Sequence, residues 1–246
     1  MKALVLAAGR GSRLESGIEQ PNKCMLRLFG KPLVQYSLEN ASRAGASEIV
    51  IVVGFQAEDV INGFGIDFEG TRIQYVIQDE PRGVVHAMEV AAPAIGGEDF
   101  MLLLADEILW NPLHADMVKN FEEKRLFGIC GVVNETKREE IQKTYALIQD
   151  ETSHRIHRLI EKPRRPQSNV RGTGNCIFRR EIFDYIEFTP INQSRGEKEL
   201  PDLIQCAIDD GEDVRSFNIG DGYVNINTPA DIEIAERENA RHFSPQ

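Results

Sequence analysis

Short continuous runs of apolar residues recur through the first half of the chain, and a polar or amphipathic stretch follows each of them. Continuous apolar runs, unlike alternating ones, are typical of strands that are buried on both faces of a sheet. The runs that fit this description are residues 3–7, 48–54, 72–77, 99–106 and 127–133.

Between these runs, apolar residues recur at helical spacing. Residues 32–45 ("PLVQYSLENASRAG") show this pattern and end at Gly45, as helices commonly do. Residues 83–95 and 111–124 show the same pattern. Strands that alternate with helices predict right-handed crossovers and a mostly parallel sheet that is covered on both faces. The pattern therefore predicts a doubly wound α/β fold.

The second half of the chain has a different pattern. Two strand-like segments, residues 144–150 and 155–163, are joined by the polar "ETSH" and predict a hairpin. We find no internal repeat and no linker, so we predict one domain in which the change near residue 140 is a change of role within one sheet. The other elements expected here are strands at 172–178, 213–219 and 223–227, an amphipathic helix at 197–211 and a final helix from Pro229.

Composition and charge exclude several classes of protein. The chain of 246 residues is 41% hydrophobic and 27% charged, as ordinary soluble globular proteins are. Its formal charge of −11 repels polyanions, so we expect neither nucleic acid nor an anionic membrane as a partner. No segment reaches the ~18 apolar residues of a membrane span.

The cysteines and the first residues indicate the compartment. The four cysteines lie far apart and form no CxxC pair, which argues against a disulfide framework and against a zinc site. The apolar "MKALVLAAG" is too short for a secretory signal. We therefore expect a cytoplasmic protein with reduced thiols.

The first predicted strand runs into the glycine-rich loop "GRGSRL", a kind of loop that commonly binds phosphate. A dinucleotide fingerprint requires glycine at position 14, where this chain has Leu14, and a P-loop requires a lysine that is missing at that spacing. What remains is a strand-end loop whose N–H groups can surround a triphosphate, with Arg13 and Lys23 as cations.

Several motifs in the same order resemble the sugar-1-phosphate nucleotidyltransferases and their "LAAGxGxRL…PK" signature. The resemblance runs from "LVLAAGRGSRL" and "PNKCM" through "IQDEPRGVVHAM", "LLLADEIL", "LIEKP" and "GTGNCIF" to "NINTPADI". It implies a Rossmann-like mixed sheet of the nucleotide-diphospho-sugar transferase type. It also implies a nucleotide-binding half (1–140), an acceptor-binding half (141–228) and a C-terminal helix and tail (229–246).

The family reaction is attack by a phosphate oxygen of the acceptor on the α-phosphorus of a nucleoside triphosphate, with release of pyrophosphate. A phosphate is already nucleophilic at neutral pH, so the residues need to neutralise charge and hold the groups in line. The resemblance assigns this catalytic role to Arg13 and Lys23. It implies Mg²⁺ as cofactor, held by Asp106 at a strand end and by Asn225, where many members have aspartate.

The resemblance also implies the contacts to the nucleotide. A glutamine amide donates and accepts hydrogen bonds, so Gln78 pairs with a pyrimidine edge, which leaves UTP, CTP and dTTP open. The residues expected to bind the nucleotide are Leu6, Ala8, Gly9, Gly11, Gln78 and Gly83.

The acceptor, a sugar 1-phosphate or a similar small phosphorylated molecule, is expected to contact Glu161, Lys162 and Asn175. Ala146 stands where the family more often has glycine, so the shape of the acceptor pocket differs from the common one. The sequence therefore leaves the acceptor open. It also leaves open whether the protein forms homo-oligomers.

Three alternatives stay open at this point. The first is a cytidylyltransferase that acts on a phosphonate or a phosphocholine-like acceptor. The second is a catalytically silent subunit that binds a nucleotide sugar and regulates a partner, although such a protein would be expected to lose the charged ligands that this chain keeps. The third, guanylyl transfer to molybdopterin, leaves the "EKP" motif unexplained.

Overall fold

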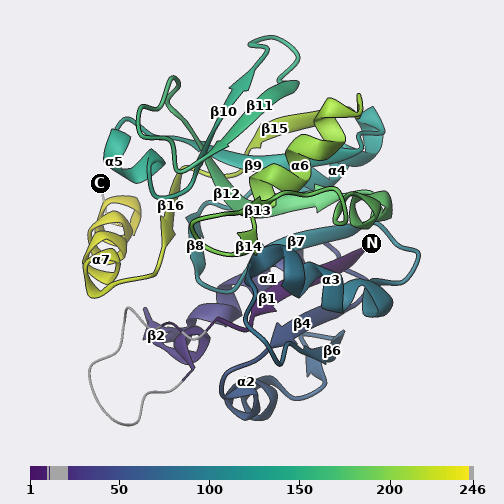
Figure 1. Ribbon diagram of the computed structural model, residues 1–246. Coiled ribbons are helices and arrows are strands. Elements are labelled where there is room, and N and C mark those ends of the chain that lie inside the picture. The colour runs from purple at the N-terminus through teal and green to yellow at the C-terminus, as the bar shows by residue number, and fades with distance from the viewer. Residues whose placement is uncertain (10, 12–21, 244–246) are drawn as a thin grey trace.

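A ten-stranded mixed sheet forms the framework of the protein in a computed structural model (Figure 1). The structure describes residues 1–9, 11 and 22–243. The strand order is β11-β10-β12-β7-β1-β4-β6-β5, and β9 and β15 extend the sheet beside β12. No helix in the described residues is long and apolar enough to cross a membrane.

The predicted parallel strands form the centre of the sheet. Strand β1 pairs in parallel with β4 on one side and with β7 on the other, and β4 pairs in parallel with β6. The five residues of β4 are all buried, as a strand inside a doubly covered sheet requires. The strands are β1 (Lys2–Ala7), β4 (Ile49–Val53), β6 (Thr71–Ile77) and β7 (Phe100–Leu104).

The second half adds antiparallel pairing. Strand β12 runs antiparallel to β7 and to β9, while β15 lies parallel to β9. The predicted hairpin is confirmed, because β10 and β11 pair antiparallel. The bounds are β9 (Gly128–Asn134), β10 (Tyr145–Gln149), β11 (Ile156–Glu161), β12 (Val170–Phe178) and β15 (Val214–Asn218).

Helices cover both faces of the sheet, as predicted. One apolar core joins the sheet to α3 and α6, and a second joins its opposite face to α1, α2 and α4. The α7 helix packs beside β16 at one side of the molecule (Figure 1). The helices are α1 (Leu33–Arg43), α2 (Ala57–Phe64), α3 (Gly83–Ile95), α4 (His114–Lys124), α5 (Arg138–Ile141), α6 (Leu200–Asp209) and α7 (Pro229–Phe243), with 3₁₀ turns η2 (Lys23–Met25) and η3 (Arg180–Tyr185).

The structure corrects some element boundaries. The helix predicted at 197–211 begins only at Leu200, because Glu197 and Lys198 form a short strand instead. The helix α2 and the strand β8 were not predicted, since each is too short to show a clear period. The short strands are β2 (Arg27–Leu28), β3 (Lys31–Pro32), β5 (Asp67–Phe68), β8 (Glu107–Trp110), β13 (Ile191–Asn192), β14 (Glu197–Lys198) and β16 (Gly222–Asn225).

Candidate active site

A cavity of about 380 Å³ opens at the carboxyl ends of β1 and β7, where open parallel sheets bind their ligands. Eight of the residues predicted from the sequence line it, and they come from segments far apart in the chain. These are Leu6, Ala8, Gly9, Gly11, Lys23, Gln78, Gly83 and Asp106. Arg13, the other predicted catalytic cation, lies outside the described residues.

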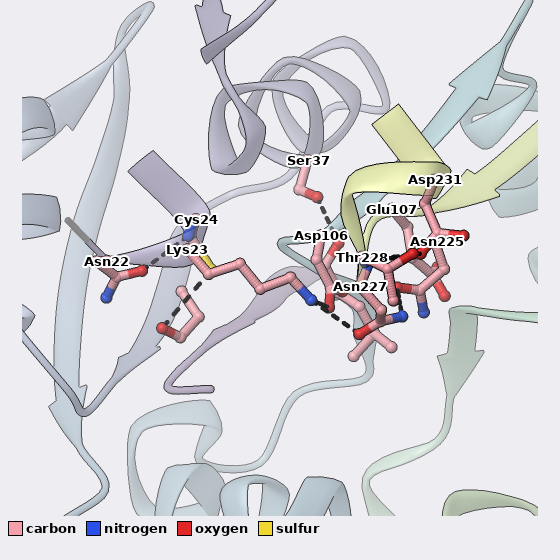
Figure 2. Close-up of polar contacts among 12 residues, drawn as sticks. Asn22, Lys23, Cys24, Ser37, Asp106, Glu107, Asn225, Asn227, Thr228 and Asp231 are labelled. Atoms are coloured by element: carbon pink, nitrogen blue, oxygen red, sulfur yellow. Dashed lines mark hydrogen bonds and ion pairs between the residues drawn. The ribbon is translucent and has the colours of Figure 1, made fainter. Parts of the chain in front are cut away.

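Lys23 is the charged centre of this cavity. Its ammonium Nζ lies 2.5 Å from Asp106 Oδ2 and 3.0 Å from Asn227 Oδ1, although the side chain is only 7% exposed (Figure 2). Buried charges need partners of this kind, because removal from water disfavours the ionised form. The structure therefore brings a cation and two oxygen acceptors to one point.

The local structure around Lys23 explains how its side chain is aimed. The Asn22 side chain accepts a hydrogen bond from the backbone N–H of Cys24 and donates one to the carbonyl of Phe55. These bonds fix the short η2 turn against the loop after β4. The backbone of Gly11 passes so close that an added Cβ would lie 2.7 Å from Lys23 Cβ, so this position requires glycine.

The side-chain oxygens of Asp106 and Asn227 are well placed to hold a cation. Asp106 follows the buried strand β7, and Asn227 follows β16. Carboxylate and amide oxygens suit Mg²⁺, which takes few protein ligands and completes its shell with phosphates and water. No cluster of three or more His, Cys, Asp or Glu side chains that could cage a metal occurs in the described part of the chain.

Asn225, the predicted second metal ligand, lies just behind this point. Its Oδ1 accepts a hydrogen bond of 2.6 Å from Asn227 Nδ2, and it does not line the cavity. Asn227, which the sequence analysis did not single out, presents its own Oδ1 to Lys23 (Figure 2). The repeat of asparagine in "NINTP" was the signal that could have indicated it.

The start of α7 holds Asn227 in place. Asp231 Oδ2 accepts hydrogen bonds from the backbone N–H groups of Asn227 and Thr228, and from the Thr228 hydroxyl. These bonds hold the pKa of Asp231 below its ordinary value despite burial, which acts in the opposite direction. The loop that carries the amide is thus tied to the helix that follows it.

Gln78 and Gly83 lie together, as the prediction requires of residues that read a base. Gln78 is 6% exposed at the end of β6, and its amide lies 2.8 Å from His86 Nδ1. Gly83 begins α3 with φ of 86°, a conformation that favours glycine. A Cβ at Gly83 would meet Glu197 Oε2 at 2.6 Å. The sequence analysis expected Glu197 to begin a helix, and the structure places it in the short strand β14 instead.

Two of the three predicted acceptor residues, Glu161 and Lys162, form a second group with residues on either side of β14. Glu161 Oε1 lies 3.3 Å from Lys162 Nζ and 3.5 Å from Arg195 NH1, and Arg195 also pairs with Glu199 at 3.0 Å. Burial raises the pKa of Glu161, and the neighbouring Lys162 acts against this rise. Arg195 is a cation that the sequence analysis did not single out.

Asn175 takes a different position from these residues. It is buried, donates through Nδ2 to Glu107 at 2.7 Å, and contacts His114 Nε2 through Oδ1 at 2.8 Å. Its amide therefore lies in a buried network with Glu107, and Asn175 is not among the residues that line the cavity. Its contact with an acceptor stays a prediction.

Glu107 ties the two-stranded β8–β16 sheet to β12 of the main sheet. Its carboxylate accepts hydrogen bonds from the Gly174 N–H, the Asn175 amide and the Tyr223 hydroxyl. Burial raises the pKa of Glu107 to about 8, against the lowering effect of the Tyr223 hydroxyl. Because Glu107 follows Asp106 directly, this network fixes the position of the Asp106 backbone.

The imidazole of His114 gives a prediction for acid stability. Burial lowers the pKa of His114 from 6.5 to about 4, so the folded protein keeps the ring neutral while the unfolded chain takes up a proton. The resulting stability is present above pH 6.5 and is lost as the pH falls through 6.5 toward 4. A shift of this size corresponds to a loss on the order of 3 kcal/mol.

We therefore expect urea unfolding to show a smaller acid destabilisation for His114→Gln than for the wild type. Glutamine retains a donor toward Asn175 but does not titrate. His157→Gln, at an exposed histidine, is the matched control and should follow the wild type. Equal pH dependence of the wild type and His114→Gln would contradict this account of His114.

Comparisons with known proteins find similarity in both sequence and fold. The profile of the nucleotidyl transferase family matches residues 2–231. A UTP–glucose-1-phosphate uridylyltransferase of Haloferax volcanii is 33% identical over 238 residues, which are 96% of each chain. A glucose-1-phosphate thymidylyltransferase of Streptomyces griseus is 30% identical over 91% of this chain, which spans 61% of that protein. The fold also matches a UDP-glucose pyrophosphorylase crystallised with UDP-glucose, with a TM-score of 0.87, 22% identity and 98% coverage of both chains.

Proposed function

This chain belongs to the nucleotidyl transferase family, and we propose that it transfers a nucleoside monophosphate from a pyrimidine nucleoside triphosphate to a sugar 1-phosphate, with release of pyrophosphate. The observation that carries the proposal is the convergence of Lys23, Asp106 and Asn227 in a cavity that the glycine-rich loop and Gln78 also line. We propose that Lys23 and the loop bind the phosphates and that Gln78 reads the base, since all of them line one volume.

The reaction requires little proton transfer from the protein. An oxygen of the acceptor phosphate attacks the α-phosphorus, the bond from the α-phosphorus to the bridging oxygen breaks, and pyrophosphate leaves with that oxygen. Lys23 neutralises charge that accumulates on the phosphates during this displacement, and Arg13 is proposed to do the same. The Cys24 thiol, which lines the cavity, takes no part as a nucleophile, because burial raises its pKa to about 12.

We propose that Mg²⁺ is the cofactor and that Asp106 and one asparagine amide hold it. When bound, the ion supplies charge neutralisation at the phosphate oxygens. Asn227 is the better placed of the two amides in this structure, since it faces Lys23 directly and Asn225 is hydrogen-bonded to it. Asn225 then either holds Asn227 in orientation or serves as a ligand itself.

The base is proposed to lie between Gln78 and Gly83. Two relatives named above act on UTP or thymidylyl donors, and an amide side chain suits the polar edge of either base. The ribose and acceptor hydroxyls need hydrogen-bond acceptors. Glu197, a carboxylate in the cavity wall without a cationic partner among the described residues, is proposed to accept from them.

The acceptor is proposed to bind beside Glu161, Lys162 and Arg195. Asn175 is also proposed to contact it, as the sequence predicted. The two cations suit a phosphate, and Glu161 suits hydroxyl donors. These three residues are not among those that line the cavity of Lys23, so the choice between a sugar and a phosphocholine-like acceptor is made by the assay below.

The experiment is pyrophosphate release from each of the four common ribonucleoside triphosphates and dTTP, with glucose 1-phosphate, N-acetylglucosamine 1-phosphate and phosphocholine as acceptors. We expect turnover with UTP or dTTP and a sugar 1-phosphate, and none without added divalent metal. Tight nucleotide-sugar binding without turnover would support a silent regulatory subunit instead.

A further inference from the structure

A second cavity, nearly as large as the first, lies where β9 and β15 end. It has a volume of about 370 Å³ and shares no lining residue with the reaction cavity. Its lining residues come from α4, from the ends of β9 and β15, and from the turn that joins β10 to β11. We call it the α4–β15 cavity, and its polar lining residues are Asn120, Lys124, Asn134, Gln149, His154, Ser216 and Asn218.

The α4–β15 cavity lies at the carboxyl ends of two parallel strands, β9 and β15. Strand β15 pairs with β9 in parallel, with Asn218 opposite Val132, and both strands end at this cavity. Strand β12 runs antiparallel to both β9 and β7, so β9 ends at the same edge of the sheet as β7. Open α/β sheets bind small molecules in crevices outside the carboxyl ends of their strands.

The side chains around this cavity are rich in unused hydrogen-bonding groups. The amides of Asn120, Asn134 and Asn218 make no side-chain hydrogen bond to any described residue. Gln149 Oε1 is buried and lacks a partner in the described structure. Buried polar atoms are nearly always satisfied, so the Gln149 carbonyl oxygen needs a donor, which a water or a ligand hydroxyl can supply.

The kind of lining indicates the class of ligand. A carboxamide donates and accepts, as a sugar hydroxyl does, so several carboxamides around one volume suit a polyhydroxylated molecule. Val132 and Phe217 add an apolar surface against which the C–H face of a sugar ring can pack.

Charge narrows the ligand class further. Lys124 and His154 are the basic side chains among the described lining residues, Lys124 is the one that carries an ammonium, and no Asp or Glu occurs among them. One cation suits one anionic group, whereas a triphosphate or a metal ion would need more. We propose that the α4–β15 cavity is a second ligand site that binds a monosaccharide carrying one anionic group, such as a sugar phosphate.

Glucose 6-phosphate is the probe that tests this proposal, titrated calorimetrically into the full chain, with glucose and inorganic phosphate as separate probes. Lys124→Gln removes the rim cation, and Asn134→Trp fills the cavity from its exposed rim. Lys119→Gln, on the same helix but outside the lining, is the matched control. Thermal unfolding of each variant checks that it is folded.

We expect saturable 1:1 binding of glucose 6-phosphate. Lys124→Gln should weaken the binding of glucose 6-phosphate several-fold without weakening the binding of glucose. Asn134→Trp should abolish the binding of glucose 6-phosphate, and Lys119→Gln should leave it unchanged. Binding that survives both cavity variants would place the sugar elsewhere, for example in the reaction cavity, and would overturn the proposal. No saturable binding at millimolar probe would show that the cavity holds water only. Turnover of the Asn134→Trp variant distinguishes failure here from failure of the proposed reaction, which does not use this cavity.

Discussion

Substitution of Lys23 by methionine is expected to lower kcat/KM for pyrophosphate release about 100- to 1,000-fold, the loss typical when one preorganised charge is removed from a transition state. Methionine retains an apolar stem, which suits the buried path of the side chain, but lacks the ammonium that meets Asp106 and Asn227. Initial rates with UTP and glucose 1-phosphate measure the effect.

The control for Lys23→Met is Lys119→Met, at an exposed lysine on α4. It should retain wild-type rates, and circular dichroism should show both variants folded. Lys23→Arg keeps the charge but not the shape, so we expect partial activity. A folded Lys23→Met variant with rates within a few-fold of the wild type would contradict the role assigned to the ammonium.

Substitution of Asp106 by asparagine is expected to have an effect of similar size for a different reason. Metal-ion charge stabilisation is worth several kcal/mol. Loss of the carboxylate that is proposed to hold the ion and that pairs with Lys23 should therefore reduce turnover on the order of 1,000-fold. The same change should weaken the binding of Mn²⁺, measured by electron paramagnetic resonance without substrate.

Mn²⁺ binding separates the metal role of Asp106 from its ion pair with Lys23. If Asp106 only holds Lys23, Asp106→Asn should lower activity but leave the Mn²⁺ affinity unchanged. Asp116→Asn, at an exposed aspartate, should change neither quantity. Comparison of Asn225→Ala and Asn227→Ala in the same assay identifies which amide contributes to the metal site.

The sequence predicted the residues that follow parallel strands better than those that meet across the fold. The loop after β1, Gln78 after β6 and Asp106 after β7 lie at the same sheet edge by topology alone, so their convergence follows from the strand assignments. Asn227 reaches Lys23 across 204 positions of sequence, and only the packing of β16 against β8 brings it there.

Side-chain orientation was the other quantity that the sequence did not contain. Asn175 donates to Glu107 and contacts His114, which its local pattern does not indicate, while its expected contact with an acceptor stays a prediction. Glu197 lies in the segment 197–211 that was expected to be a helix, but with Lys198 it forms the short strand β14, and Arg195 precedes that strand. Local patterns define elements, whereas the direction of a polar side chain depends on partners contributed by distant segments.

The most direct test of the central claim is phosphorus NMR of the wild-type protein with UTP, glucose 1-phosphate and Mg²⁺. The account predicts equal amounts of pyrophosphate and of a nucleoside diphosphate sugar, with its two coupled phosphorus signals, formed at the expense of both substrates. The same measurement is repeated with dTTP and with N-acetylglucosamine 1-phosphate. The account is contradicted if both nucleotides remain intact with every sugar 1-phosphate, or if UTP is hydrolysed while the sugar phosphate is not consumed.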